Sequence, residues 1–301
     1  MELVVGVDAG GTASTAVVAT TGGRIVGRGR SGPGNPLTAG AGNAATAVAA
    51  AVREALGEHS PALVGAATLG IAGPASAAPF APALAALGVT GPVGVVGDVV
   101  TAFAAGSPAE SGAVLVAGTG AIAAAVRADA VVRTEDGLGW LLGDEGSGRW
   151  LGLQAVRTAV RNWSSPFAAR VAAQAGVRTA DEMVYWAQAL PLGEITELAP
   201  LVCAAARAAD PHATAIVGAA VAHLVHTLDE LRPDGPVVLA GGLLTTGTPV
   251  RDGVLGILRE RGLRPRTGRD PAAGAAWLAA RPRSPLSPAA LHDALLGSVV
   301  D

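Results

Sequence analysis

Two glycine-rich turns carry the residue types that bind phosphate groups. The first occurs in VVGVDAGGTASTAVV, and the second in VLVAGTGAI. Glycines let the backbone approach a ligand closely, and the consecutive N–H groups of such turns form concave anion-binding sites. We therefore expect phosphate contacts from Gly10, Gly11, Thr12, Thr15, Gly118, Thr119 and Gly120. Each turn alone also suits an ordinary hairpin, so the prediction of a triphosphate clamp rests on the pair.

Two carboxylates follow strand-like segments and suit the chemistry of phosphoryl transfer. Asp8 stands at the mouth of the first turn, where it could hold Mg²⁺ through water against the phosphates. Asp98 could accept the proton of a hydroxyl group that attacks the γ-phosphate. The sequence leaves two structural alternatives open, in which Asp8 bonds its own backbone and Asp98 caps a helix starting at Val99.

The composition excludes several other kinds of chemistry. All 21 basic residues are arginines, so a Walker P-loop and a Schiff-base lysine are excluded. The single cysteine, Cys203, permits no intrachain disulfide and reads as a buried helix residue. The net charge is −3 without a basic run, and Gly, Pro, Asp and Arg interrupt every apolar stretch. We expect a cytoplasmic protein with neither nucleic-acid nor membrane partners.

The elements that must position these residues repeat along the chain. Each half begins with three strand-like segments, and the segment 106–112 is the predicted linker between domains 1–108 and 109–301. The predicted strands are Leu3–Val7, Ala16–Ala19, Arg24–Arg30, Ala66–Ile71, Val93–Val96, Ala113–Ala117, Ile122–Arg127, 130–133 and Val237–Ala240. The predicted helices are 39–57, 77–87, a short helix after Asp98, 145–162, 166–175, 180–189, 194–208, 211–231, 248–260 and 271–280, before a Pro-rich tail from Arg281.

In the order of its motifs, the chain resembles the actin-like sugar kinase and Hsp70 ATPase superfamily, and within it the BadF/BadG-type N-acetylglucosamine kinases. The two turns match the phosphate motifs, TLGIAGP (68–74) looks like the connecting strand, and VVLAGGLL (237–244) is similar to the adenosine motif. The resemblance runs from residue 4 to about 279. It implies a two-lobed actin-like (ribonuclease H-like) α/β fold with a βββαβαβα core in each lobe. The resemblance is also compatible with a C-terminal helix that packs on the first lobe.

The resemblance also implies roles for residues outside the two turns. Gly241 and Gly242 would lie against the nucleotide, and Asp98 would be the catalytic base that also contacts the sugar. The sugar would be bound by Asn35, Asp98, Thr119, Gly139, Trp140 and Asp144. Polar acceptors that match ring hydroxyls, beside an apolar wall, suit a sugar. Alternatively, Asn35 belongs to an ordinary Asn-Pro turn and Asp144 caps the following helix, with Glu145 as a sugar ligand or a helix-start charge.

The sequence therefore predicts an ATP- and Mg²⁺-dependent kinase for an amino sugar, with N-acetylglucosamine at its 6-hydroxyl as the first choice. Glucosamine, a muramic acid derivative or another hexose stays open as the acceptor, because Ala121 stands where serine is expected in many relatives. A sensor that binds sugar and ATP without turnover is the alternative outside the enzymes. A dehydratase activator would need cluster cysteines that the chain lacks. Relatives are often dimers, so the resemblance also implies a homodimer.

Overall fold

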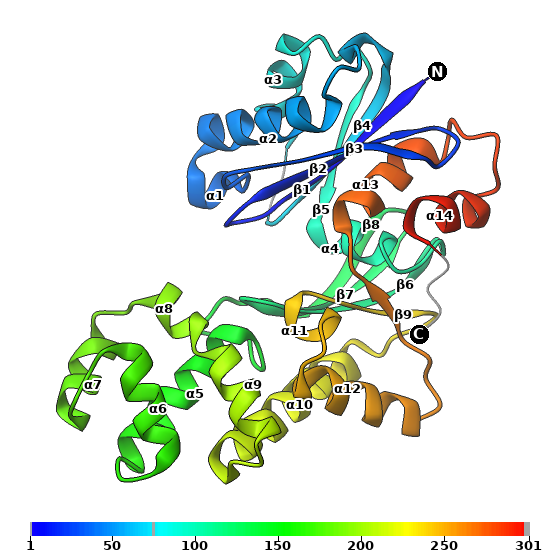
Figure 1. The fold of residues 1–301 in the computed structure, drawn as a ribbon. Coiled ribbons are helices and arrows are strands. Elements are labelled where there is room, and N and C mark those ends of the chain that lie inside the picture. The colour runs from blue at the N-terminus through cyan, green and yellow to red at the C-terminus, as the bar shows by residue number, and fades with distance from the viewer. Residues whose placement is uncertain (1, 74–75, 298–301) are drawn as a thin grey trace.

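The computed structural model describes residues 2–73 and 76–297, and it shows the same sheet twice (Figure 1). Each half contains a five-stranded mixed sheet, ordered β3-β2-β1-β4-β5 in the first and β8-β7-β6-β9-β10 in the second. The first sheet consists of β1 Leu3–Ala9, β2 Ser14–Thr20, β3 Ile25–Ser31, β4 Val64–Ile71 and β5 Val93–Gly97. The second consists of β6 Ser111–Ala117, β7 Ala121–Arg127, β8 Ala130–Asp136, β9 Val237–Ala240 and β10 Arg266–Gly268.

The strand pairing confirms the predicted internal repeat. In each sheet the first three strands are antiparallel neighbours, and the other two run parallel to the first. The hairpin registers place Asp8 opposite Thr15 in the first half and Ala117 opposite Ala121 in the second. Each hairpin therefore holds its glycine-rich turn at the same end of its sheet.

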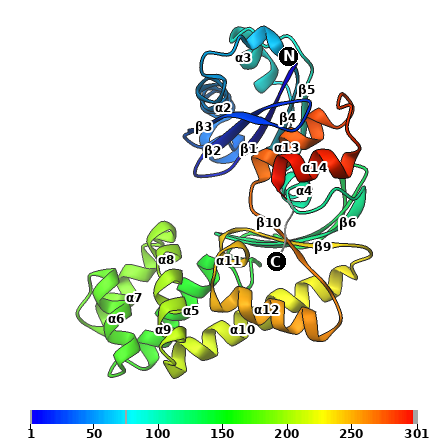
Figure 2. The ribbon, with the colours of Figure 1, turned by 45° about the vertical axis from the view of Figure 1, so that its right-hand side comes forward.

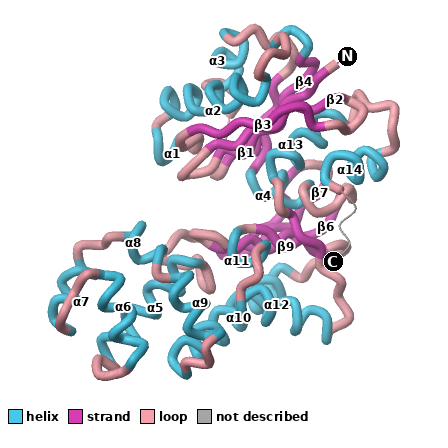
Figure 3. The backbone as a smooth tube through the Cα atoms, viewed as in Figure 1, coloured by secondary structure: helices cyan, strands magenta, loops and turns pink. Residues whose placement is uncertain are grey.

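Helices cover both sheets, and most of them belong to the second half (Figure 3). The first half contains α1 Pro36–Ala39, α2 Ala41–Leu56, a 3₁₀ turn at Pro61–Leu63, α3 Phe80–Ala86 and α4 Asp98–Ala104. Between β8 and β9 follow α5 Gly148–Arg161, α6 Pro166–Ala175, α7 Ala180–Gln188, α8 Leu192–Glu197, α9 Ala199–Arg207 and α10 Pro211–Leu231. The remaining helices are α11 Gly242–Thr245, α12 Pro249–Glu260, α13 Pro271–Ala280 and α14 Pro288–Leu296.

The late helix α13 packs against the first sheet rather than the second (Figures 1 and 2). Its small side chains are buried, and its backbone lies so close to β1 that a Cβ on Gly6 would be 2.1 Å from the Ala276 nitrogen. Glycine is required at this position because any side chain would overlap the helix backbone. One apolar cluster contains Val4 from β1, Val114 from β6 and Trp277 from α13, so a single core joins the two halves.

No helix was predicted in the Pro-rich tail from Arg281, but residues 288–296 form α14. Ser287 caps this helix and Pro288 occupies its first turn, where proline is compatible with a helix. The Trp277 indole N–H donates to the Pro288 carbonyl at 3.0 Å, and His292 Nε2 bonds the Ala104 carbonyl at 2.9 Å. These contacts fix α14 beside α13 and the end of α4.

Other differences concern element ends. The predicted helix 194–208 is divided at Leu198 into α8 and α9, and β10 was not predicted. Pro74 of the expected 68–74 motif lies outside the described residues. The domain boundary near residue 108 stays a prediction. Among the described residues, no single helix is long and apolar enough to cross a membrane, and only a bent pair, Ala180–Gln188 with Leu192–Arg207, passes that test.

Candidate active site

The first glycine-rich turn is closed by backbone bonds and supported by the loop before α1. Gly10 N–H donates to Ala13 O at 3.0 Å, and the N–H groups of Gly34 and Asn35 donate to Gly10 O at 3.0 and 3.2 Å. Within the described residues, the N–H groups of Gly11 and Thr12 donate no backbone hydrogen bond. These two adjacent donors are available to an anion, as predicted for a phosphate-binding turn.

Asn35 lies next to this turn but also has a structural task. Its Oδ1 accepts a hydrogen bond from Leu37 N–H at 2.8 Å, which caps α1, and the residue is buried. No described residue bonds its Nδ2, so the amide can still donate to a ligand. The structure thus brings Asn35 to the first turn and leaves its role in sugar binding a prediction.

Two other carboxylates come close enough to Asp8, at this end of the first sheet, to affect it. Burial, followed by the negative charges of Asp98 and Asp270, raises the pKa of Asp8 to about 6. Burial also raises the pKa of Asp98, although the N–H groups of Val99 and Asp98 act in the opposite direction. The structure therefore brings Asp98 and Asp270 near Asp8 and concentrates negative charge there.

Asp270 is a member of this group that the sequence analysis missed. Its Oδ1 accepts from Ala273 N–H at 3.0 Å and caps α13, and its Oδ2 pairs with Arg28 at 2.7 Å. The Asp-Pro step before an apolar helix is a recognisable cap signal. Nothing in the sequence indicates that the packing of α13 on β1 brings this cap near Asp8.

The helix-cap alternative for Asp98 is wrong in its detail. The helix α4 begins at Asp98 itself, with Gly97 as the cap, and the Asp98 Oδ1 accepts from the adjacent Val99 N–H at 2.9 Å. The side chain is half-buried. No other described residue donates a hydrogen bond to the second carboxylate oxygen, which can therefore accept a proton or bind a hydroxyl group.

The second glycine-rich turn is held by the start of α5. Gly148 N–H donates to Gly118 O at 2.7 Å, and Arg149 N–H donates to Thr119 O at 3.4 Å. A Cβ on Gly118 would be 3.9 Å from the Gly242 nitrogen, so the predicted adenosine motif adjoins this turn. The two glycine-rich turns are not hydrogen-bonded to each other in the described part of the chain.

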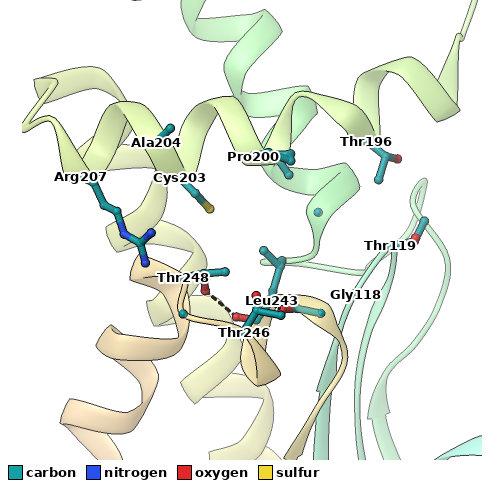
Figure 4. A pocket seen from close by; sticks show the side chains of 14 residues that line it. Gly118, Thr119, Thr196, Pro200, Cys203, Ala204, Arg207, Leu243, Thr246 and Thr248 are labelled. Carbon is teal, nitrogen blue, oxygen red and sulfur yellow. Dashed lines mark hydrogen bonds between the residues drawn. The ribbon is translucent and has the colours of Figure 1, made fainter. Parts of the chain in front are cut away.

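A pocket of about 580 Å³ extends from the second turn along α9 (Figure 4). Gly118, Thr119 and Gly242, which were predicted to bind the nucleotide, line it, whereas Gly241 packs against the Ala117 backbone. The rest of the lining was not predicted: Thr196, Pro200, Cys203 and Arg207 form the opposite wall, and Thr246 and Thr248 lie on the side of Gly242. This volume lies in the range of small-molecule and cofactor sites.

The end of this pocket away from the second turn is formed by α9 and the segment before α12. The Cys203 thiol and the Arg207 guanidinium point into it, and Thr248 lies opposite (Figure 4). Cys203 is in a helix and only 8% exposed, as predicted, and burial raises the pKa of its thiol. No described residue forms a hydrogen bond or an ion pair with the Arg207 guanidinium.

The segment between β8 and α5 carries the predicted sugar-binding carboxylate. Asp144 is buried, and its Oδ1 accepts from Ala121 N–H, beside the second turn, at 3.3 Å. Burial raises the pKa of Asp144, while the Ala121 N–H and the positive charge of Arg149 lower it. The alternative in which Asp144 caps the following helix is wrong, because Ser147 accepts from Trp150 N–H and caps α5.

Asp136, which the sequence analysis missed, fixes the position of Asp144. Its Oδ1 accepts from Asp144 N–H at 2.7 Å, and its Oδ2 accepts from Glu145 N–H at 2.9 Å. Both Asp136 and Asp144 have positive φ angles, of 60° and 57°. Glu145 in turn pairs with His223 of α10 at 2.7 Å, which favours a structural role over sugar binding.

The predicted sugar wall, Gly139-Trp140, lies in the same segment. Trp140 is half-buried, while Leu138, Leu141 and Leu142 around it are 64%, 74% and 76% exposed. Gly139 has a φ of 80°, which glycine adopts without strain, and a Cβ added there would meet no atom within 4 Å. The structure therefore leaves an apolar surface at this segment, and the contact of Trp140 with a sugar stays a prediction.

The repeated halves, the pocket and the carboxylates are together typical of one class of protein. Two repeated halves each present a glycine-rich hairpin turn, a ligand-sized pocket adjoins the second turn, and clustered carboxylates adjoin the first. This is the two-lobed, actin-like arrangement of nucleotide-dependent phosphotransferases. The chain belongs to the BadF/BadG/BcrA/BcrD ATPase family, whose model matches residues 5–279.

Solved structures show the same fold. A proposed N-acetylglucosamine kinase from Chromobacterium violaceum is 26% identical, with a TM-score of 0.75 over 92% of this chain and 99% of that one. A proposed N-acetylglucosamine kinase from Porphyromonas gingivalis is 22% identical, with a TM-score of 0.72 over 98% and 99% of the two chains. A ROK family glucokinase from Streptomyces griseus, in complex with glucose and AMPPNP, is 22% identical, with a TM-score of 0.61 over 92% and 99%.

The comparisons confirm the predicted fold and family, and they agree with the predicted class of enzyme, an ATP-dependent sugar kinase. No curated protein matches this sequence significantly. The particular sugar and the role of each residue are not determined by these similarities.

Proposed function

We propose that this protein transfers the γ-phosphoryl group of ATP to an amino sugar, with the 6-hydroxyl of N-acetylglucosamine as the expected acceptor. The observation that carries the proposal is the continuity of the pocket with the second glycine-rich turn, next to which the buried carboxylate of Asp144 lies. A nucleotide in the pocket would direct its phosphates to Gly118 and Thr119. The sugar would then bind between Asp144 and Asp98.

Asp98 would act as the general base. Its raised pKa makes the carboxylate a stronger proton acceptor, and one of its oxygens is free of protein hydrogen bonds among the described residues. The attacking hydroxyl would lose its proton to this oxygen as its own oxygen approaches the γ-phosphorus. Asn35 would donate from its Nδ2 to the sugar, beside the first turn.

The residues present also fit a magnesium ion held with the nucleotide. The described residues contain no cluster of three or more side chains able to hold a metal by themselves. Mg²⁺ is commonly bound by one or two carboxylates together with phosphate oxygens, and a cation would offset the repulsion among Asp8, Asp98 and Asp270. Asp8 is the residue that would hold it, and when bound the ion would neutralise charge on the phosphates.

The acceptor is the least constrained part of the proposal. The two proposed N-acetylglucosamine kinases among the similar structures favour an acetylated amino sugar, while the glucokinase keeps glucose open. The Ala121 side chain offers no hydroxyl group at the end of the second turn. Glucosamine, N-acetylmannosamine and N-acetylmuramic acid therefore belong in the same substrate screen. A cytoplasmic homodimer stays a prediction.

The test is an ADP-release assay with these sugars, ATP and Mg²⁺, followed by the Asp98→Asn variant. General bases contribute about 100- to 10,000-fold in rate, so Asp98→Asn should reduce kcat by that factor while nucleotide binding persists. The exposed Asp234→Asn variant serves as the matched control and should keep full activity. Near-normal turnover in Asp98→Asn would refute Asp98 as the base. Sugar binding by the unmodified protein without ADP release would refute the kinase itself.

A further inference from the structure

Arg149 is a half-buried cation whose guanidinium forms no hydrogen bond or ion pair with the described residues. It is the second residue of α5, and its Nε is buried with no hydrogen bond. No residue in the described ranges forms an ion pair with its guanidinium. Arginine cannot become neutral in a protein, and an unpaired buried charge is costly, so such a group usually has a partner of opposite charge.

The location of Arg149 indicates what that partner is. Its own N–H donates to Thr119 O at 3.4 Å, and the preceding Gly148 lines the proposed nucleotide pocket and donates to Gly118 O. Its charge acts on the buried carboxyl of Asp144, although burial has the larger effect on the pKa of that group. Arg149 therefore lies where the second turn, the nucleotide pocket and the proposed sugar site meet.

The composition adds an independent reason for an arginine at this point. Phosphoryl transfer depends largely on neutralising negative charge on the transferred group, and many enzymes use a lysine for this purpose. This chain contains no lysine. The arginine that lines the pocket, Arg207, lies on α9 at the far end from the second turn, where the base of a nucleotide would be.

We propose that Arg149 binds the γ-phosphoryl group of ATP and stabilises it during transfer to the sugar. This inference rests on the proposed function. In the reaction, a bond forms between the sugar oxygen and the γ-phosphorus while the bond from that phosphorus to the β,γ-bridging oxygen breaks. ADP leaves with the electron pair, and the hydroxyl proton passes to Asp98. Arg149 donates N–H hydrogen bonds to the phosphoryl oxygens throughout and stays protonated.

The variants Arg149→Met and Arg149→Lys test this role, with Arg157→Met as the control. Arg157 lies on the same helix and is exposed. Removing one donor that stabilises a transition state reduces kcat by about 100- to 1,000-fold, and we expect this loss in Arg149→Met. Arg149→Lys should keep more activity because it retains the charge, and Arg157→Met should match the unmodified protein.

Two further measurements separate this role from a structural one. Arg149→Met should unfold at the same urea concentration as the unmodified protein or a higher one, because the variant lacks a half-buried charge that forms no ion pair. In calorimetry without sugar, the unmodified protein should bind AMPPNP more tightly than ADP, and Arg149→Met should lose this preference. A variant that loses activity together with stability, or that keeps the AMPPNP preference, overturns the proposal.

The binding measurement also distinguishes this inference from the proposed function. If the unmodified protein phosphorylates no sugar but Arg149→Met loses the AMPPNP preference, the sugar kinase proposal fails, and only the binding of the γ-phosphoryl group by Arg149 is retained. If the unmodified protein phosphorylates a sugar and Arg149→Met does so within threefold of its rate, the role of Arg149 is refuted and the kinase stands.

Discussion

Replacing Asp8 by asparagine should stabilise the free protein while abolishing its activity. Asp8 is half-buried, and burial together with Asp98 and Asp270 raises its pKa from 3.8 to about 6. A carboxyl whose pKa is raised by folding destabilises the folded state when it is ionised. The penalty is absent below the unfolded pKa, grows as the pH rises through the interval from about 4 to 6, and is constant above it.

The size of the effect follows from the shift in pKa. Each unit corresponds to 1.36 kcal/mol, so a shift of about two units gives an upper value of about 3 kcal/mol. Partial solvent exposure of Asp8 reduces this figure, and we expect Asp8→Asn to raise the free energy of unfolding by about 1–3 kcal/mol at pH 7.5. At pH 4 most of this difference should be gone, because Asp8 is then protonated in the folded state and partly protonated in the unfolded state.

Urea unfolding in EDTA, at several pH values between 4 and 7.5, measures this difference without a bound metal. The exposed Asp234→Asn variant is the control, and its stability should differ from that of the unmodified protein by less than about 0.5 kcal/mol at every pH. The ADP-release assay should show that Asp8→Asn has lost turnover. An asparagine variant that is less stable at pH 7.5, or whose added stability persists at pH 4, would refute the reasoning.

Three other variants test separate parts of the structure. Arg207→Ala should raise the KM for ATP about tenfold and leave the KM for the sugar unchanged in the ADP-release assay, since its guanidinium lines only the nucleotide pocket. Asp136→Asn keeps one of the two oxygens that accept backbone hydrogen bonds, and asparagine tolerates the positive φ at this position. This variant should raise the KM for the sugar about tenfold with little change in kcat. An equal rise in the KM for ATP would contradict this expectation. Gly6→Ala should lower the free energy of unfolding in urea by about 3 kcal/mol or more, because its Cβ would overlap the α13 backbone, and an unchanged urea midpoint would contradict that packing.

The elements that could be predicted most accurately are helices whose first residues carry a capping signal in the sequence. The helices α6, α10 and α13 begin at Pro166, Pro211 and Pro271, each directly after a serine or aspartate that caps the helix, and their bounds agree with the predictions. The same signal, Ser287-Pro288, begins α14, but no helix was predicted there because of the prolines around it. Cap chemistry therefore predicted these helices more reliably than the overall content of proline.

The candidate site was predictable only where its residues lie in short motifs. Gly118 and Thr119 could be found because the turn itself carries the chemistry. The wall formed by Cys203 and Arg207 could not, because α9 reaches the second turn only through the packing of distant segments. The role of Asp136 was hidden for a similar reason, since two positive φ angles bring its carboxylate back to the backbone eight residues later.

The position of α13 has a consequence for how the protein is made. A ribosome synthesises β1 long before α13, yet α13 covers one face of the sheet that contains β1. The apolar face formed by Val4 and Val17 must remain without this cover until more than 250 further residues have been added. The first sheet is therefore covered only after the strands of the second sheet have been synthesised, and a chain that stops before Pro271 would expose this face to aggregation.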